Sequence, residues 1–261
     1  MVTKEVGHDF LARLGKKRLR PGGVEATNWL IEQGQFSQDC HVLEVACNRC
    51  TTAIELAKTF GCQIDAVDLN PKVVKEAQER VAVEGLTRHI TVSQANALSL
   101  PFPDNHFDIV INEAMLTMLN AQAKEKALNE YWRVLKPGGR LLTHDVAYED
   151  PKTRQVLDEL RQTIHVNVAP LSLTGWQALY QEHGFSQVTY HHGKMSLMTP
   201  RGMIKDEGLM NTLNIMRRGL KKENRQQFLK MRRFFYQNRQ KSLLYCCKKC
   251  KINLRPTCPY N

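Results

Sequence analysis

The sequence predicts an α/β fold built on a doubly wound, mostly parallel β-sheet. Between residues 41 and 147, short apolar runs alternate with segments of helical spacing, which is the pattern of βαβ units. The first run, residues 41–46, is apolar apart from Glu44, as expected of a strand buried on both faces. Residues that favour helix starts, such as Asn70 and Pro71, and helix ends, such as Gly61, also flank the helical segments between the runs.

The predicted strands are runs rich in Val, Ile and Leu, residues that favour a pleated and buried surface. In chain order they cover residues 41–46, 63–69, 89–93, 107–112, 140–146, 187–191 and 243–247. The last two follow the regular alternation at longer intervals, so they are expected to complete the sheet after its parallel part.

The helices are predicted from their boundary residues. Gly61 can end a helix in the left-handed conformation, and Asn70 caps a helix whose first residue is Pro71. The step Lys136-Pro137-Gly138-Gly139 is expected to stop a helix and turn the chain into the next strand. The predicted helices cover residues 51–60, 71–85, 121–135, 174–184, 203–218 and 223–240.

Four regions are expected along the chain. Residues 1–40 form an N-terminal helical cap, and residues 41–192 form the core with the ligand site. Residues 193–241 are a basic helical insertion before the last strand, expected to be a lid over a substrate or an interface between subunits. Residues 242–261 hold the last strand and a tail rich in Cys and Lys.

Positive charge is concentrated at the ends of the chain. The net charge is +11, and residues 201–261 carry 16 Lys or Arg against 3 Asp or Glu. Solvated helix faces and a loose tail are the favoured explanation, with an RNA, membrane or anionic-substrate role as the alternative. No apolar run approaches the ~20 residues that span a bilayer. The N-terminal residues lack an apolar signal core, so a cytoplasmic protein is expected.

The eight cysteines are expected to be reduced thiols and not to form a disulfide framework. Cys47 and Cys50 have the spacing of redox and zinc pairs, but no second pair lies near them in the sequence. Cys246, Cys247 and Cys250 are too closely spaced for standard zinc knuckles. No metal site is therefore expected.

A ligand site is expected at the carboxyl ends of the parallel strands. Residues 46–50 form the turn from the first strand into a helix whose N-terminus would face the ligand. Asp68 ends the second strand, where its carboxylate can accept hydrogen bonds from ribose hydroxyls. These two features would also serve a nicotinamide-dependent dehydrogenase, but the Gly-x-Gly-x-x-Gly turn of such enzymes is absent.

Three further segments carry a resemblance to a known family: residues 94–102, 107–116 and 134–142. With them the chain resembles the class I S-adenosylmethionine-dependent methyltransferases, in the group of the ubiquinone and menaquinone biosynthesis C-methyltransferases. The resemblance runs from about Val42 to Val146, and the Leu-Lys-Pro-Gly-Gly step is a particularly specific part of it. It implies a Rossmann-like, seven-stranded sheet with an antiparallel last strand, and S-adenosylmethionine as cofactor.

The resemblance also implies roles for single residues. Glu44 would lie beneath the methionine moiety of the cofactor, and Asn112 would offer its backbone near the methionine amino group. Asp68 would bind the ribose, while the adenine would be contacted by Leu69, Asn96 and Ala97.

The turn departs from the family pattern, because Ala46, Asn48 and Cys50 stand at its three glycine positions. Glycine permits a positive φ there, and Asn tolerates that conformation better than other residues. Thr117 and Met118 replace two histidines of the family, so the resemblance by itself does not imply quinone-methylating chemistry.

The expected function is methyl transfer from S-adenosylmethionine to a small molecule. The catalytic residues are not identified by the pattern, and the candidates for a base are Glu113, His144, Asp145 and Tyr148, at the ends of two strands. Two alternatives are an RNA methyltransferase that uses the basic ends, and a protein that binds S-adenosylmethionine without transferring its methyl group. A homodimer is left open.

Overall fold

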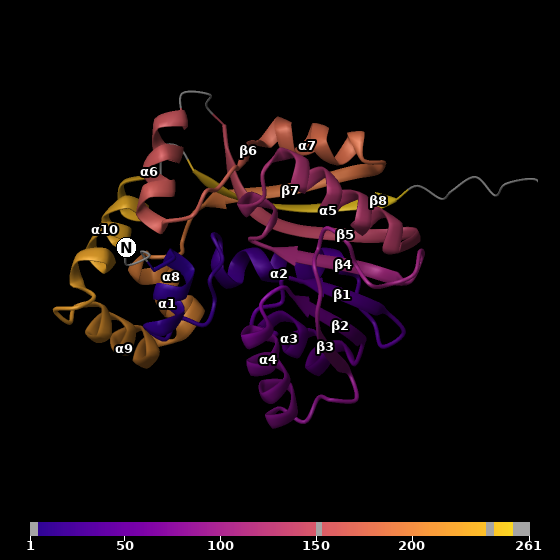
Figure 1. Cartoon of the computed structure of the whole chain (residues 1–261), viewed down its shortest axis with the longest axis horizontal. Helices are drawn as coiled ribbons and strands as arrows, with labels where there is room; N and C mark the ends of the chain where they lie inside the picture. The colour runs from indigo at the N-terminus through magenta and orange to yellow at the C-terminus, as the bar shows by residue number, and fades with distance from the viewer. Residues whose placement is uncertain (1–4, 150–152, 239–242, 253–261) are drawn as a thin grey trace, which may run out of the picture.

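The structure is a computed structural model that describes residues 5–149, 153–238 and 243–252. One twisted sheet runs through its centre, with the strand order β3-β2-β1-β4-β5-β8-β7 and the short β6 paired with β5 (Figure 1). The strands are β1 (His41–Val45), β2 (Gln63–Asp68), β3 (Ile90–Gln94), β4 (Phe107–Glu113), β5 (Leu135–Tyr148), β6 (Leu171–Ser172), β7 (Phe185–Lys194) and β8 (Leu244–Ile252).

The strand pairing confirms the doubly wound, mostly parallel sheet predicted from the sequence. Strands β1 to β5 pair in parallel with their neighbours, whereas β8 lies antiparallel between β5 and β7. The two-residue β6 is an addition to the seven predicted strands. The strand order reverses between β1 and β4, so the carboxyl ends of these two strands open the crevice in which doubly wound sheets bind ligands.

Helices cover both faces of this sheet and form a separate group at its end (Figure 1). The helices are α1 (Gly7–Arg13), α2 (Gly23–Gly34), α3 (Thr51–Phe60), α4 (Pro71–Val83), η1 (Leu116–Met118), α5 (Ala121–Val134), α6 (Arg154–Ile164), α7 (Leu173–Glu182), α8 (Pro200–Glu207), α9 (Leu209–Gly219) and α10 (Arg225–Asn238). In the described part of the chain, no helix has both the length and the apolar character needed to cross a membrane.

Three apolar cores hold the layers together. Alternate side chains of the buried strands point to opposite faces, so Val42 packs with α2, α3 and α4, whereas Leu43 packs with α5 and α7. The third core joins α1 and α6 with α8, α9 and α10 through side chains such as Phe10, Leu157 and Met231. This third core is built outside the sheet, beside the carboxyl ends of its strands (Figure 1).

Two predicted boundaries were wrong, each for a local reason. The single helix predicted over residues 203–218 is divided into α8 and α9, because Gly208 adopts a positive φ of 77° between them. The step at 136–139 is not a turn before the strand. Strand β5 already begins at Leu135, and its register against β4 shifts before Arg140. In addition, α6 was not predicted at all.

Candidate functional site

The turn after β1 adopts left-handed backbone at each position where the family has glycine. The φ angles of Ala46, Asn48 and Cys50 are 57°, 48° and 52°. This confirms that the positions need positive φ, which costs an alanine or cysteine roughly 1–2 kcal/mol relative to glycine. The backbone N–H of Cys47 donates to the carbonyl of Val67 at 3.0 Å, so β2 holds the turn against the sheet.

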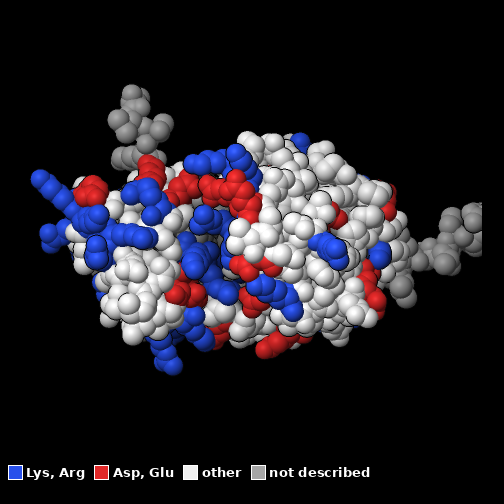
Figure 2. All heavy atoms as spheres, turned by 90° about the horizontal axis from the view of Figure 1, so that it is seen from below, with Lys and Arg blue, Asp and Glu red and all other residues white. Residues whose placement is uncertain are grey.

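A polar cleft of about 300 Å³ opens at this turn. Four of the predicted cofactor residues line it, namely Glu44, Ala46, Asn48 and Asp68. The opposite wall comes from the N-terminal segment that precedes α2, including the basic residues Lys17 and Arg20. Figure 2 shows Lys and Arg side chains in a hollow between the helical end of the molecule and the sheet.

Asp68 lies at the end of β2 and forms part of the turn itself. Its carboxylate accepts one hydrogen bond from the backbone N–H of Asn48 and one from that of Asn70, each at 3.0 Å. These two bonds occupy one lone pair on each oxygen and leave acceptor capacity for a ligand. The side chain therefore has a structural role in the turn, and it keeps acceptor capacity for the ribose-binding role that the sequence predicts.

Glu44 is buried beneath the same turn, with 5% of its surface exposed. It accepts a hydrogen bond from the backbone N–H of Ala53 at 3.1 Å, in the first turn of α3. Burial raises the pKa of Glu44 to about 8, although the charge of Arg20 acts in the opposite direction. The carboxyl group is thus mainly protonated at neutral pH in the absence of a cationic ligand.

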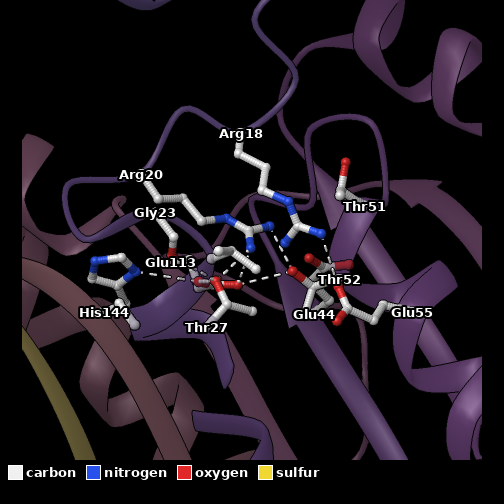
Figure 3. A network of polar contacts seen from close by, with 12 residues as sticks. Arg18, Arg20, Gly23, Thr27, Glu44, Thr51, Thr52, Glu55, Glu113 and His144 are labelled. Atoms are coloured by element: carbon white, nitrogen blue, oxygen red, sulfur yellow. Dashed lines mark hydrogen bonds and ion pairs between the residues drawn. The ribbon is translucent and has the colours of Figure 1, made fainter. Parts of the chain in front are cut away.

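Glu113, at the end of β4, is the centre of a hydrogen-bonded network (Figure 3). Arg20 pairs with its carboxylate at 2.9 Å, and the hydroxyls of Thr27 and Thr52 donate to it at 2.8 and 2.9 Å. His144 lies 3.2 Å away through its Nδ1 atom. The network ties the N-terminal segment, α2 and α3 to the sheet.

The same network determines the charge of Glu113. Burial alone would raise the pKa of Glu113, but the charge of Arg20 and the contacts with His144 and Thr27 outweigh it and lower the pKa to about 2. A carboxylate held ionised in this way is a poor proton acceptor at neutral pH. Its negative charge also helps to keep the nearby Glu44 neutral.

The other three candidates for a base lie outside the lining of the cleft, and two of them are held in buried hydrogen bonds. His144 is fully buried, and its Nε2 accepts from the backbone N–H of Gly22 at 3.0 Å. Its proton therefore lies on Nδ1, directed at Glu113. Asp145 is buried against Thr117, and the half-buried Tyr148 packs into the third core. Neither His144, Asp145 nor Tyr148 lines the polar cleft.

The remaining predicted cofactor residues do not line the cleft in this structure. Leu69 is 63% exposed at the end of β2, where an adenine could cover it. Asn96 accepts from the backbone N–H of Leu98 at 3.0 Å, which is the geometry of a turn residue, and Ala97 lies within that turn. Asn112 is fully buried and donates to the carbonyl of Val45 at 3.2 Å.

A second cavity, almost entirely apolar and about 80 Å³ in volume, adjoins the polar cleft. Most of its walls come from the third core, through α1, α6 and α10. Four residues line both cavities, namely His8, Leu19, Ala114 and Met118. The sequence did not indicate this cavity, because its walls come from segments more than 200 residues apart, such as those of Leu11 and Phe235.

His8 is the one ionisable residue that lines both cavities in the described part of the chain. Its Nδ1 atom is buried and has no hydrogen-bond partner among the described residues, while its Nε2 atom lies 3.4 Å from Asp9. Sequence reasoning missed this residue, since a single histidine in a seven-residue helix carries no recognisable motif.

The seven described cysteines are free and buried, and Cys258 lies outside the described residues. Among the described residues, the side chains of His41, Asp65 and His106 come close enough to suggest a metal site. The carboxylate of Asp65 is already 2.8 Å from Nε2 of His41. The group lies towards the amino ends of the strands, on the opposite edge of the sheet from the cleft.

Comparisons with known proteins agree with this geometry. Residues 42–139 match the family model described as a methyltransferase domain. A protein of Haemophilus influenzae described as uncharacterized is 55% identical over 90% of this chain and 94% of its own length. The demethylmenaquinone methyltransferase of Lactiplantibacillus plantarum is 30% identical over 62% of this chain and 67% of its own length.

The chain belongs to the class I S-adenosylmethionine-dependent methyltransferases. A solved structure agrees at the level of the fold. The phosphoethanolamine N-methyltransferase 2 of Haemonchus contortus, in complex with S-adenosylmethionine, matches with a TM-score of 0.76 at 16% identity. The match covers 95% of this chain and 56% of that protein.

The cofactor of this methyltransferase is S-adenosylmethionine, and the cleft fits it. An acidic side chain ends β2, the turn backbone at Ala46 and Asn48 is left-handed, and the cleft volume of about 300 Å³ accommodates a nucleoside with an amino-acid tail. The neutral, buried carboxyl group of Glu44 can ionise beside a cation.

Proposed function

We propose that this methyltransferase transfers the methyl group to a small molecule whose reacting part is apolar. The observation that carries the proposal is the apolar cavity that adjoins the polar cofactor cleft and shares part of its lining. An acceptor in the apolar cavity would lie next to the cleft, in a region from which apolar side chains exclude water.

We propose that Asp68 and Glu44 hold the two ends of the cofactor. Asp68 would accept from the ribose hydroxyls, and Glu44 would face the cationic methionine end after losing its proton. Leu69, Asn96, Ala97 and Asn112 are retained as proposed contacts of the adenine and the amino group. The bound cofactor supplies an electrophilic methyl group on a sulfonium, so the protein needs chiefly to align the acceptor and to exclude water.

His8 is the proposed proton acceptor for this reaction. Its Nδ1 atom is buried at the boundary of the two cavities without a partner, and Asp9 can accept the proton that Nε2 carries in the matching tautomer. Glu113 and His144 then serve to position Arg20 and the N-terminal segment rather than to move a proton.

The apolar cavity also argues against the two alternatives, an RNA methyltransferase and a protein that binds S-adenosylmethionine without transferring its methyl group. A nucleic-acid acceptor would bring a charged backbone to the site, whereas the apolar cavity offers almost no polar surface to it. A protein that only binds the cofactor would have no need for an adjoining cavity with an imidazole whose Nδ1 atom has no partner among the described residues. Both observations favour a small apolar acceptor.

The test is transfer of tritium from methyl-labelled S-adenosylmethionine to a panel of phenols, hydroquinols, aromatic amines and fatty acids. Label in at least one organic product supports the proposal. Label found only in added RNA, or a bound cofactor with no labelled product from the whole panel, contradicts it.

A matched pair of variants assigns the transfer to the cavity. Leu197→Trp fills the apolar cavity with a bulky side chain and should lower transfer at least about tenfold while cofactor binding is retained. Val83→Trp adds the same side chain at a position that is 88% exposed on α4, and should change neither quantity. Equal transfer by both variants would show that the acceptor binds elsewhere.

A further inference from the structure

An exposed apolar stripe runs along α9, on the part of the molecule added to the sheet. Leu209, Leu213 and Leu220 are 57%, 54% and 47% exposed, and their spacing places them on one side of the helix. The opposite side of α9 is buried in the third core through Ile215. These three leucines therefore do not contribute to the packing of the helix against the third core, and they lie together on one side of it.

Basic residues border this stripe. Between residues 208 and 238 the chain has eight Lys or Arg and a single acidic residue, Glu223. Arg217 lies beside the leucines on the helical wheel, Lys221 directly follows Leu220 after the end of α9, and Arg232 and Arg233 are on the neighbouring α10. No salt bridge among the described residues involves any of these eight basic side chains. In Figure 2 the helical end carries Lys and Arg around an uncharged area.

The combination identifies the kind of partner. A surface that only binds RNA needs positive charge and hydrogen-bond donors but gains nothing from exposed leucines. An amphipathic helix that lies on a bilayer needs both: leucines that enter the acyl boundary, and Lys or Arg that are attracted to anionic headgroups. The stripe on α9 and its basic border meet both requirements.

We infer that the α9–α10 surface, defined by Leu209, Leu213, Leu220, Arg217, Lys221 and Arg232, docks the protein on an anionic lipid bilayer. The docking itself does not depend on the proposed acceptor. It has a consequence for that proposal, however, because α10 also lines the apolar cavity through Met231 and Phe235. A lipid-soluble acceptor could pass from the bilayer to the cavity along this helix.

The test is co-sedimentation of the full chain with vesicles. Vesicles of phosphatidylcholine with about 30% phosphatidylglycerol should bind the protein, binding should weaken in high salt, and pure phosphatidylcholine should bind it at least about tenfold more weakly. Retention by both vesicle types alike, or by neither, would overturn the inference.

Variants separate the contribution of the exposed leucines from that of the basic residues. Leu213→Gln with Leu220→Gln should lower vesicle binding about tenfold or more, as should Arg217→Glu with Lys221→Glu. The control is Lys72→Glu with Lys75→Glu, which makes the same charge change on the exposed side of α4 and should leave binding nearly intact if the α9–α10 surface is the docking site. Circular dichroism and binding of S-adenosylmethionine confirm that each variant is folded.

RNA binding is the competing outcome. Filter binding of a mixed RNA sample tests this outcome. The surface is an RNA site if the wild-type protein retains RNA and Arg217→Glu with Lys221→Glu abolishes the retention. In that case Leu213→Gln with Leu220→Gln should affect neither RNA binding nor vesicle binding. Vesicle binding that is lost in both sets of variants supports the inference.

Discussion

Two adjoining cavities at the carboxyl ends of the strands differ in the polarity of their walls. The larger is lined by charged and polar groups from β1, β2 and the N-terminal segment, including Glu44, Asp68 and Arg20. The smaller is lined mainly by apolar side chains from α1, α6 and α10, from the loops beside them and from Val146 of β5. The two cavities share only the four lining residues His8, Leu19, Ala114 and Met118.

The difference follows from how each cavity is built. Strand ends and helix N-termini present free backbone groups and the short polar side chains that satisfy them, so the crevice of a parallel sheet suits a polar cofactor. The apolar cavity has almost no such groups in its walls, because the helices around it contact one another there through apolar side chains. The end of the sheet thus suits a polar cofactor, and the cavity beside the added helices suits the apolar acceptor that we propose.

The largest expected effect comes from the residue between the two cavities. His8→Ala should lower kcat by about 10²–10⁴-fold with an acceptor found in the labelled panel, because the proton acceptor is lost. The Kd for S-adenosylmethionine should change less than about threefold. His8→Gln, which keeps hydrogen bonding but not basicity, should be as slow as His8→Ala. A His8→Gln variant with wild-type kcat would remove His8 from the chemistry.

The next effect should be confined to the polar cleft. Asp68→Ala should raise the Kd for S-adenosylmethionine about 10- to 100-fold, since hydrogen bonds to a charged group are lost. Part of this loss would come from the turn, because Asp68 also holds the N–H groups of Asn48 and Asn70. Equilibrium binding measures it, with Glu79→Ala on the exposed side of α4 as the control. An unchanged Kd would mean that Asp68 serves the turn alone.

A smaller effect should appear as proton release. Since burial raises the pKa of Glu44 to about 8, its carboxyl group is mainly protonated at pH 7, and a cation bound beside it would lower the pKa again. Binding of S-adenosylmethionine at pH 7 should therefore release up to one proton, and affinity should rise with pH up to about 8. Calorimetry in two buffers of different ionisation enthalpy measures the release. Glu44→Gln should abolish it, and release that persists in this variant would point to another group.

The smallest effect is expected at the turn. Ala46→Gly should relieve the strain of a φ of 57°, but the freer unfolded chain offsets this gain, so the free energy of unfolding should change by less than about 1 kcal/mol. Ala53→Gly, in the regular helix α3, should destabilise the protein by about 1–2 kcal/mol, because it adds freedom to the unfolded chain and removes a buried methyl group. Chemical denaturation compares the two variants. If Ala46→Gly is the more destabilising of the two, the turn is not strained.

The sheet and the polar half of the site could be predicted because their signals are local. The helix predicted at residues 51–60 is α3 to the residue, since Gly61 ends it. Glu44 was found as the one acid within an apolar run, and Asp68 as the acid that ends the next strand. The left-handed turn could be predicted as well, because the family has glycine there.

The apolar half could not be predicted, because its signals are distributed. Leu11, Leu160 and Phe235 each occur in an ordinary amphipathic helix, and nothing in their spacing shows that three distant helices enclose a cavity. The charge state of Glu113 was equally hidden, since Arg20 and Thr27 reach it from a segment more than 80 residues away. Long-range packing decides both features.

The cleft between β1, β2 and the N-terminal segment is the proposed binding site of S-adenosylmethionine. Equilibrium dialysis of the full chain against radiolabelled S-adenosylmethionine tests it most directly. We expect saturable binding of one cofactor per chain, displaced by S-adenosylhomocysteine and weakened in Asp68→Ala. Absence of saturable binding at high micromolar cofactor, in a protein shown by circular dichroism to be folded, would contradict the account.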